Sequence, residues 1–136
     1  MDTDVLVAAI RSPAGSSSAL LVLLLERRAT MLLSVALALE YEATATRAEH
    51  LFAAKASEAD VANLIDAIID VIHPVEVHYQ WRPQLSDAGD EMVLETAVNG
   101  RADAIVTFNR RHFGEAASRF GIEVISPAEA LERGRK

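Results

Sequence analysis

The sequence predicts an α/β protein with a central, mostly parallel β-sheet and helices on both of its faces. Short apolar runs alternate along the chain with longer segments in which apolar residues recur at helical spacing. Strands that alternate with helices pair in parallel, because a parallel crossover needs a helix lying on the sheet. With 136 residues, 51% of them apolar, the chain has the size of one domain with its own core. We therefore expect a single domain over residues 1–136.

The first half of the chain is expected to contain two short strands and three helices. Pro13 and Gly15 stop the first apolar run, and serines at 16–18 can cap the helix that follows. Ser34 caps the next helix in the same way, while Ser57 and Asp60 have the spacing of a capping box. In order, we expect a strand at 4–8, a helix at 16–28, a strand at 30–33 and helices at 35–47 and 57–69.

The second half repeats the alternation. Because Pro74 lacks a backbone N–H, the extended stretch at 71–79 is expected to be an edge or bent strand. Ser86 or Asp87 opens a helix that Asn99-Gly100 ends. The remaining elements are a strand at 104–107, a basic helix at 110–120, a strand at 121–125 and a helix that opens at 126–129.

Composition limits the function classes. The chain has no cysteine, which excludes disulfides and thiolate metal sites, and the acidic start Met1-Asp2-Thr3-Asp4 does not resemble a signal peptide. The longest apolar run, at 19–25, is too short to span a bilayer, so we expect a cytoplasmic protein without a membrane. A net charge of −7 disfavours a purely electrostatic nucleic-acid binder. This negative charge disfavours a metal-dependent nuclease much less, since clustered carboxylates bind divalent cations that in turn bind the phosphate.

Acidic and polar side chains occur where ligands bind in parallel α/β sheets, near the carboxyl ends of the strands. Each acid alone also has an ordinary explanation, as a helix cap, a helix-dipole partner, a polar helix edge or a frayed terminus. Converging on one pocket, they would suit Mg²⁺ or Mn²⁺, which prefer oxygen ligands. The candidates are Asp2 and Asp4 in the first strand, Glu40 in a helix, Asp87 and Asp90 in the first turn of another, and Thr107 and Asn109 after a late strand.

Five segments together resemble the PIN-domain family, in particular the bacterial PIN toxins of toxin–antitoxin pairs. The resemblance covers nearly the whole chain, and the order of the motifs makes it specific. The segments are Asp-Thr-Asp-Val-Leu-Val at 2–7, the acid-bearing helix at 34–42, Asp-Ala-Gly-Asp with its apolar continuation at 87–97, the strand ending Thr-Phe-Asn at 102–109, and Ile-Ser-Pro-Ala-Glu at 125–129.

The resemblance implies a three-layer α/β/α fold and a Mg²⁺- or Mn²⁺-dependent endoribonuclease that leaves a 3′-hydroxyl and a 5′-phosphate. Asp2, Glu40 and Asp90 would be the catalytic, metal-binding acids. It also implies a toxin with a cognate antitoxin protein, and a homodimer. The auxiliary residues would be Asp4, Asp87, Thr107 and Asn109.

Two of three departures from the family pattern support an alternative, a degenerate PIN domain that binds RNA or a protein partner without cleaving. Asn109 stands where many relatives carry an acid, and relatives have several apolar residues before the position of Asp2. The third departure, Asp4 where Asn is usual, would partly restore the charge. A third hypothesis, an unrelated α/β phosphotransfer or hydrolase domain, is disfavoured because neither a phosphate-binding Gly-rich loop nor a nucleophile elbow is present.

Other residues are candidates for contacts with RNA or a partner. Arg11, Arg110 and Arg111 come just after expected strands and would grip phosphates at the rim of the pocket. The unbroken apolar run at 21–25 exceeds what one buried face requires, so part of it is expected to face a partner. The histidines lack metal-ligand spacing and are expected to be surface or satisfied residues: His50, His73, His78 and His112.

Overall fold

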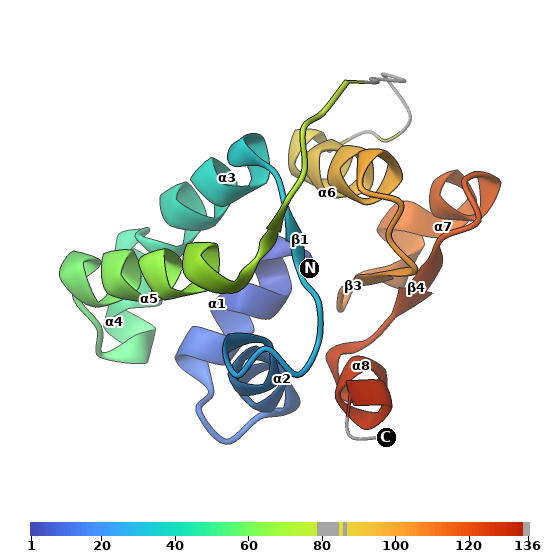
Figure 1. Ribbon diagram of the computed structural model, residues 1–136. Coiled ribbons are helices and arrows are strands. Elements are labelled where there is room, and N and C mark those ends of the chain that lie inside the picture. Colours follow the sequence, from blue (N-terminus) through green and yellow to red (C-terminus); the bar gives the residue numbers. More distant parts are fainter. Residues whose placement is uncertain (79–84, 86, 135–136) are drawn as a thin grey trace.

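The computed structural model describes residues 1–78, 85 and 87–134 and is mostly helical. Figure 1 shows the N-terminal half of the chain on one side, the C-terminal half on the other, and the N-terminus between them near β1 and β3. The elements are α1 (Thr3–Arg11), α2 (Ser16–Leu25), β1 (Leu32–Leu33), α3 (Val35–Ala45), α4 (Ala48–Ala54), α5 (Glu58–Val71), β2 (His73–Pro74), α6 (Ala88–Asn99), β3 (Ala104–Val106), α7 (Arg110–Arg119), β4 (Glu123–Ile125) and α8 (Pro127–Gly134).

All strand pairs within the described residues are parallel, as the alternation predicted. β1 pairs with β2, with Leu32 opposite His73, and β3 pairs with β4, with Ala104 opposite Glu123. The expected central sheet is nevertheless divided into two separate two-stranded pieces. The parallel pairing expected of an α/β protein is therefore confirmed, whereas the expectation of one continuous central sheet is wrong for the described residues.

An apolar groove of about 670 Å³ lies between the two sheet pieces, lined by residues of β1, β3, α2 and α6. The carbonyls of Met31 and Leu33 accept hydrogen bonds from the backbone N–H groups of His73 and Val75. The backbone N–H and carbonyl of Leu32, between them, therefore point the other way, into the groove. On the opposite wall the Val106 carbonyl accepts a hydrogen bond of 2.8 Å from the Asp2 N–H. The first residues of the chain thus touch the free edge of β3 without forming a strand.

The strand expected at 4–8 is wrong, because these residues belong to α1, and Asp4 lies in its first turn. Val5, Leu6 and Ala9 are buried on one side of this helix. A short apolar run has the same appearance in a buried strand and in a buried helix, so periodicity could not separate the two. Asp2 lies at the N-cap of α1 rather than within a strand.

The local capping signals predicted most helix starts correctly. Ser57 Oγ accepts from the Asp60 N–H at 3.1 Å, and an Asp60 carboxylate oxygen accepts from the Ser57 N–H at 2.8 Å, which completes the capping box. Ser34 caps α3, and Asp87 caps α6. Two residues used in the expected elements lie outside the described residues. They are Tyr79, at the end of the extended stretch at 71–79, and Ser86, one of the two expected helix starts.

Several element ends differ from expectation. The helix at 16–28 ends at Leu25, since Arg27 has a left-handed backbone with φ of 60°. The helix expected to reach Arg47 ends at Ala45, and a separate helix, α4, follows. The strand at 30–33 is reduced to Leu32–Leu33. The basic helix α7 is kinked at Gly114, whose φ of 26° disfavours any other residue.

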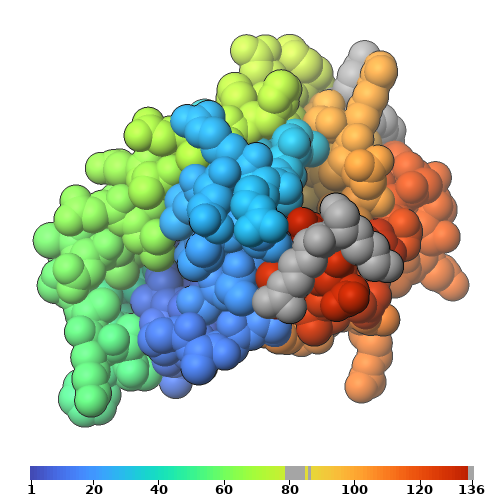
Figure 2. All heavy atoms as spheres, turned by 60° about the horizontal axis from the view of Figure 1, so that its bottom comes forward, coloured from blue at the N-terminus to red at the C-terminus, as the bar shows by residue number. Residues whose placement is uncertain are grey.

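The apolar run at 21–25 is mostly covered within the chain itself. α2 packs against α1, α5 and α8, and Leu21, Leu23 and Leu24 are buried, whereas Val22 is 51% exposed. Figure 2 shows the red C-terminal helix beside the blue N-terminal segment on this face. Burial against these helices accounts for most of the run, and that its exposed part faces a partner stays a prediction.

Among the described helices, none is by itself both long and apolar enough to cross a membrane. The bent pair α1 and α2, which meet at 104°, meets that criterion of length and composition only when the two are taken together.

Candidate active site

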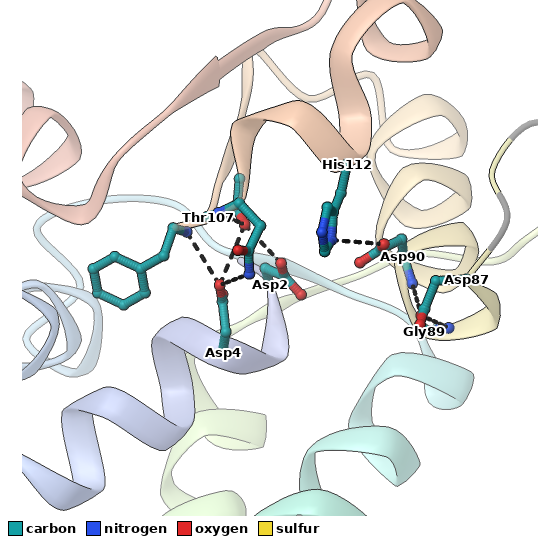
Figure 3. A network of polar contacts seen from close by, with 9 residues as sticks. Asp2, Asp4, Asp87, Gly89, Asp90, Thr107 and His112 are labelled. Carbon is teal, nitrogen blue, oxygen red and sulfur yellow. Dashed lines mark hydrogen bonds and ion pairs between the residues drawn. The ribbon is translucent and has the colours of Figure 1, made fainter.

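Asp2 is firmly held beside the end of β3 (Figure 3). Its backbone N–H donates to the Val106 carbonyl, and its Oδ2 accepts a hydrogen bond of 2.7 Å from the Thr107 hydroxyl. The carbonyl of the preceding Met1 accepts a hydrogen bond from the buried Tyr41 hydroxyl. Asp2 is 6% exposed and Thr107 is fully buried, so the acid next to the chain end is not frayed.

Asp4 lies beside the same strand end and contacts the Thr-Phe-Asn segment. Its Oδ2 accepts hydrogen bonds from the Asn109 amide at 2.8 Å and the Phe108 backbone N–H at 3.2 Å. Burial, and next the neighbouring charge of Asp2, raise the pKa of Asp4 to about 6. Its Oδ1 is buried and has no hydrogen-bond partner among the described residues. Asn109 therefore takes part in the site as an anchor for Asp4.

Asp87 and Asp90 flank the first turn of α6. Asp87 Oδ1 accepts from the backbone N–H groups of Gly89 at 2.8 Å and Asp90 at 3.1 Å, so Asp87 acts as a helix cap. An Asp90 carboxylate oxygen lies 3.1 Å from Nδ1 of His112 on α7. Burial and then the charges of Asp2 and Asp87 raise the pKa of Asp90, while His112 opposes that shift.

Glu40 approaches the same turn from α3. Its Oε1 accepts a hydrogen bond of 3.0 Å from the Thr44 hydroxyl, one helical turn further on. A Cβ atom at Gly89 would lie 3.1 Å from Asp87 Oδ1 and 3.6 Å from Glu40 Oε1. Glu40 and Asp87 therefore both lie beside Gly89 in the first turn of α6, and a side chain at Gly89 would crowd the Asp87 carboxylate.

The predicted acids therefore form two neighbouring groups rather than one tight cluster. Asp2 and Asp4 lie beside β3, while Glu40, Asp87 and Asp90 surround the start of α6. Within the described residues, no three carboxylate or imidazole groups are close enough to hold one metal ion. The two groups are still electrostatically coupled, because the charge of Asp2 contributes to the raised pKa of Asp90.

The chemistry of these side chains fits a hard divalent cation. The candidate donors are carboxylate oxygens, which Mg²⁺ and Mn²⁺ prefer. The buried Asp4 Oδ1 has no partner among the described residues, and a buried acceptor of this kind is normally satisfied by a proton donor, a water or an ion.

The predicted arginines have different surroundings. Arg11 lines a polar groove together with Asp4, Glu40 and Asp87. Arg110 forms an ion pair with Glu129 at the start of α8. Arg111 is exposed in the first turn of α7.

Sequence reasoning missed Arg47 and His50, which line the groove beside the acids, and placed His112 at the rim of the pocket without predicting its pairing with Asp90. His112 follows Asn109 at i, i+3, a helical spacing that could have drawn attention to it. Arg47 and His50 had no such signal, because their place depends on the unpredicted helix α4.

Comparison with known proteins supports the family resemblance. A family profile described as PIN domain matches residues 1–111, which include all the acids of the two groups. No curated protein and no solved structure matches the chain. Because the match extends over most of the 136 residues, the chain belongs to the PIN-domain family.

Proposed function

We propose that this protein is a metal-dependent endoribonuclease. PIN domains are generally nucleases, so family membership supports a nuclease-type function. The observation that carries the proposal is the pair formed by the buried Asp2 and the partly buried Asp4, whose carboxylates both lie beside the Thr107 hydroxyl. The charge of Asp2 contributes to the raised pKa of Asp4 and of Asp90, and acids gathered in this way are typical of sites that bind cations.

In the proposed reaction a water oxygen forms a bond to phosphorus as the bond from phosphorus to the 3′-oxygen breaks. The products are a 3′-hydroxyl and a 5′-phosphate. Asp2, Glu40 and Asp90 would hold Mg²⁺ or Mn²⁺, which would lower the pKa of a water and offset the phosphate charge.

The other residues of the site position these acids. The Thr107 hydroxyl fixes one oxygen of Asp2, and His112 fixes one oxygen of Asp90. Asn109 donates to Asp4 but adds no charge, so Asp2 and Asp4 together supply the negative charge on this side of the site.

The test is cleavage of a labelled single-stranded RNA in the presence of Mn²⁺. The proposal predicts cleavage that EDTA abolishes and that Asp90→Asn lowers by at least about a hundredfold. Asp66→Asn, which removes an exposed acid on α5, is the matched control and should cleave at the parent rate. Absence of metal-dependent cleavage, or equal cleavage by Asp90→Asn, would reject the enzymatic proposal.

A second candidate is a degenerate PIN domain that binds RNA or protein without cleaving. It is favoured by the absence, among the described residues, of three ligands close enough to share one ion. It predicts RNA binding without cleavage, and an affinity that does not depend on Mn²⁺.

We further propose that the protein acts in the cytoplasm as the toxin of a toxin–antitoxin pair and forms a homodimer. The likeness of its motifs to those of bacterial PIN toxins supports this role. Exposed apolar side chains are compatible with a protein partner, namely Val35 and Leu39 on α3 and Phe52 on α4, which are 77%, 62% and 89% exposed. Light scattering that gives only a monomer would reject the dimer, and expression without growth arrest would reject the toxin role.

A further inference from the structure

A second groove, of about 660 Å³, extends from the acids along α1 and α3. Most of the residues that line it are charged or polar, whereas most of those that line the groove between the sheet pieces are apolar. Its lining includes the acids Asp4, Glu40 and Asp87, together with Arg11, Arg47 and His50.

The two long walls of this groove repeat one arrangement. On α1, Asp4 is followed seven residues later by Arg11; along α3 and the turn after it, Glu40 is followed seven residues later by Arg47. Within α1 the seven residues correspond to about two turns and about 10 Å, while Arg47 lies beyond the end of α3, at the N-cap of α4. α1 and α3 pack against one another, and the groove therefore changes from acidic to basic along its length.

The arginines at the basic end are not neutralised. Among the described residues, neither Arg11 nor Arg47 forms an ion pair with a carboxylate, whereas Arg110 pairs with Glu129 and Arg133 pairs with Glu123. Their guanidinium groups are exposed and keep donors available for an anion.

His50 completes this end of the groove. Arg11 Nη1 lies 3.3 Å from His50 Nδ1, and since a guanidinium can only donate, Nδ1 must accept. The neutral ring then carries its proton on Nε2, which lies 3.8 Å from a carboxylate oxygen of the exposed Glu49, so His50 serves this end of the groove by holding the Arg11 guanidinium in place. The His50 side chain is only 17% exposed, so its orientation is fixed by its surroundings.

We propose that Arg11, Arg47 and His50 form a phosphate-binding site that holds the RNA backbone beside the acidic centre. The inference rests on the proposed function and deepens it, because it names where a phosphate flanking the cleaved bond is bound. Arginine forks match phosphate oxygens in pairs, and contacts of this kind position a nucleic acid without reading its sequence.

The decisive experiment measures RNA binding without cleavage. The probe is a fluorescent single-stranded RNA of about ten nucleotides, titrated in EDTA with the Asp90→Asn protein over a range of salt concentrations. Arg11→Gln and Arg47→Gln should each weaken binding about tenfold at about 50 mM salt and lower the slope of log K against log salt by about 0.7. Arg119→Gln, which removes an exposed arginine at the end of α7, should leave both values unchanged.

A purely structural role, in which Arg11 joins α1 to α4 through His50, makes a different prediction. Arg11→Gln would then lower the melting temperature and leave the salt slope intact, and Arg11→Lys would not restore the melting temperature. Under the phosphate proposal, Arg11→Lys retains most of the slope. In the Asp90-containing protein with Mn²⁺, the arginine variants should raise KM more than they lower kcat.

Each result bears on one proposal separately. Metal-dependent cleavage with unchanged binding by both arginine variants would overturn the phosphate site and leave the ribonuclease proposal intact. Arginine-dependent binding without any cleavage would support the phosphate site and reject the enzyme. No binding by the parent protein at low salt, or displacement of the RNA by polyglutamate as effective as by unlabelled RNA, would overturn the assignment to nucleic acid.

Discussion

Replacing Asp4 with Asn should stabilise the metal-free protein at neutral pH. The folded-state pKa of Asp4 is raised from 3.8 to about 6, first by burial and then by Asp2. A raised pKa means that the folded state holds the proton more tightly than the unfolded state does. The carboxylate therefore costs no stability below about pH 4; its cost grows as pH rises from about 4 to about 6 and is constant above that. Asn removes the charge, and its amide can still accept from Asn109 and donate to Asp2.

The magnitude follows from the size of the shift. A difference of about two pKa units corresponds to at most about 3 kcal/mol. Because Asp4 is only partly buried, solvent screening reduces the expected effect to about 1–2 kcal/mol. For a domain of this length that is about 3–6 °C in melting temperature.

The assay is thermal unfolding in EDTA at about pH 4 and about pH 7.5. The parent protein should lose stability between these values, while Asp4→Asn should change less and melt higher at the upper pH. Asp66→Asn serves as the control for loss of one exposed acid. Added Mn²⁺ should raise the melting temperature of the parent more than that of Asp4→Asn, since ligand binding stabilises the folded state by mass action. A difference between parent and variant that is the same at both pH values would refute the reasoning.

Three further changes test the packing around the site. Tyr41→Phe leaves the Met1 carbonyl without its buried donor and should lower the free energy of unfolding by about 1–3 kcal/mol; an unchanged urea midpoint would argue against that bond. Ser34→Ala removes the cap of α3 and a 2.7 Å hydrogen bond to Thr96, at a cost of about 1–3 kcal/mol in the same measurement. A Val-Leu-Ile-Val extension before Met1 should enter the groove between β1 and β3 and add about 1–3 kcal/mol relative to Gly-Ser-Gly-Ser, and equal melting of the two would show that the groove takes no strand.

Features set by neighbouring residues were predictable from the sequence. The capping box at Ser57 and Asp60, the cap at Ser34 and the cap at Asp87 each need only three or four consecutive residues, and all three form. The order of short motifs identified the family, and the family profile confirms it. Such signals do not depend on how the helices pack.

Features set by distant contacts were not predictable. The apolar run at 4–8 could satisfy either a strand or a helix, and only packing on the core decided for the helix. The division of the sheet depends on which strand edges meet, and the apolar pattern of each strand does not specify that. The pair formed by His112 and Asp90 depends on how α7 crosses the start of α6. The basic end of the polar groove depends on α4, whose sequence has no strong start signal.

The position of Asp2 depends on both halves of the molecule at once. Its backbone and carboxylate are held by Val106 and Thr107 of the C-terminal half, and the carbonyl before it is held by Tyr41 of α3. The Thr107 contact joins residues 105 positions apart in the sequence, so it forms only after the chain has folded. Buried carboxylates repel one another, and the apolar packing of α1, α2 and α3 must outweigh that repulsion when no cation is bound. The acidic centre is thus assembled by the packing of the whole domain. A change at Tyr41 should disturb Asp2 through the Met1 carbonyl, whereas a change at Thr107 should disturb both Asp2 and Asp4.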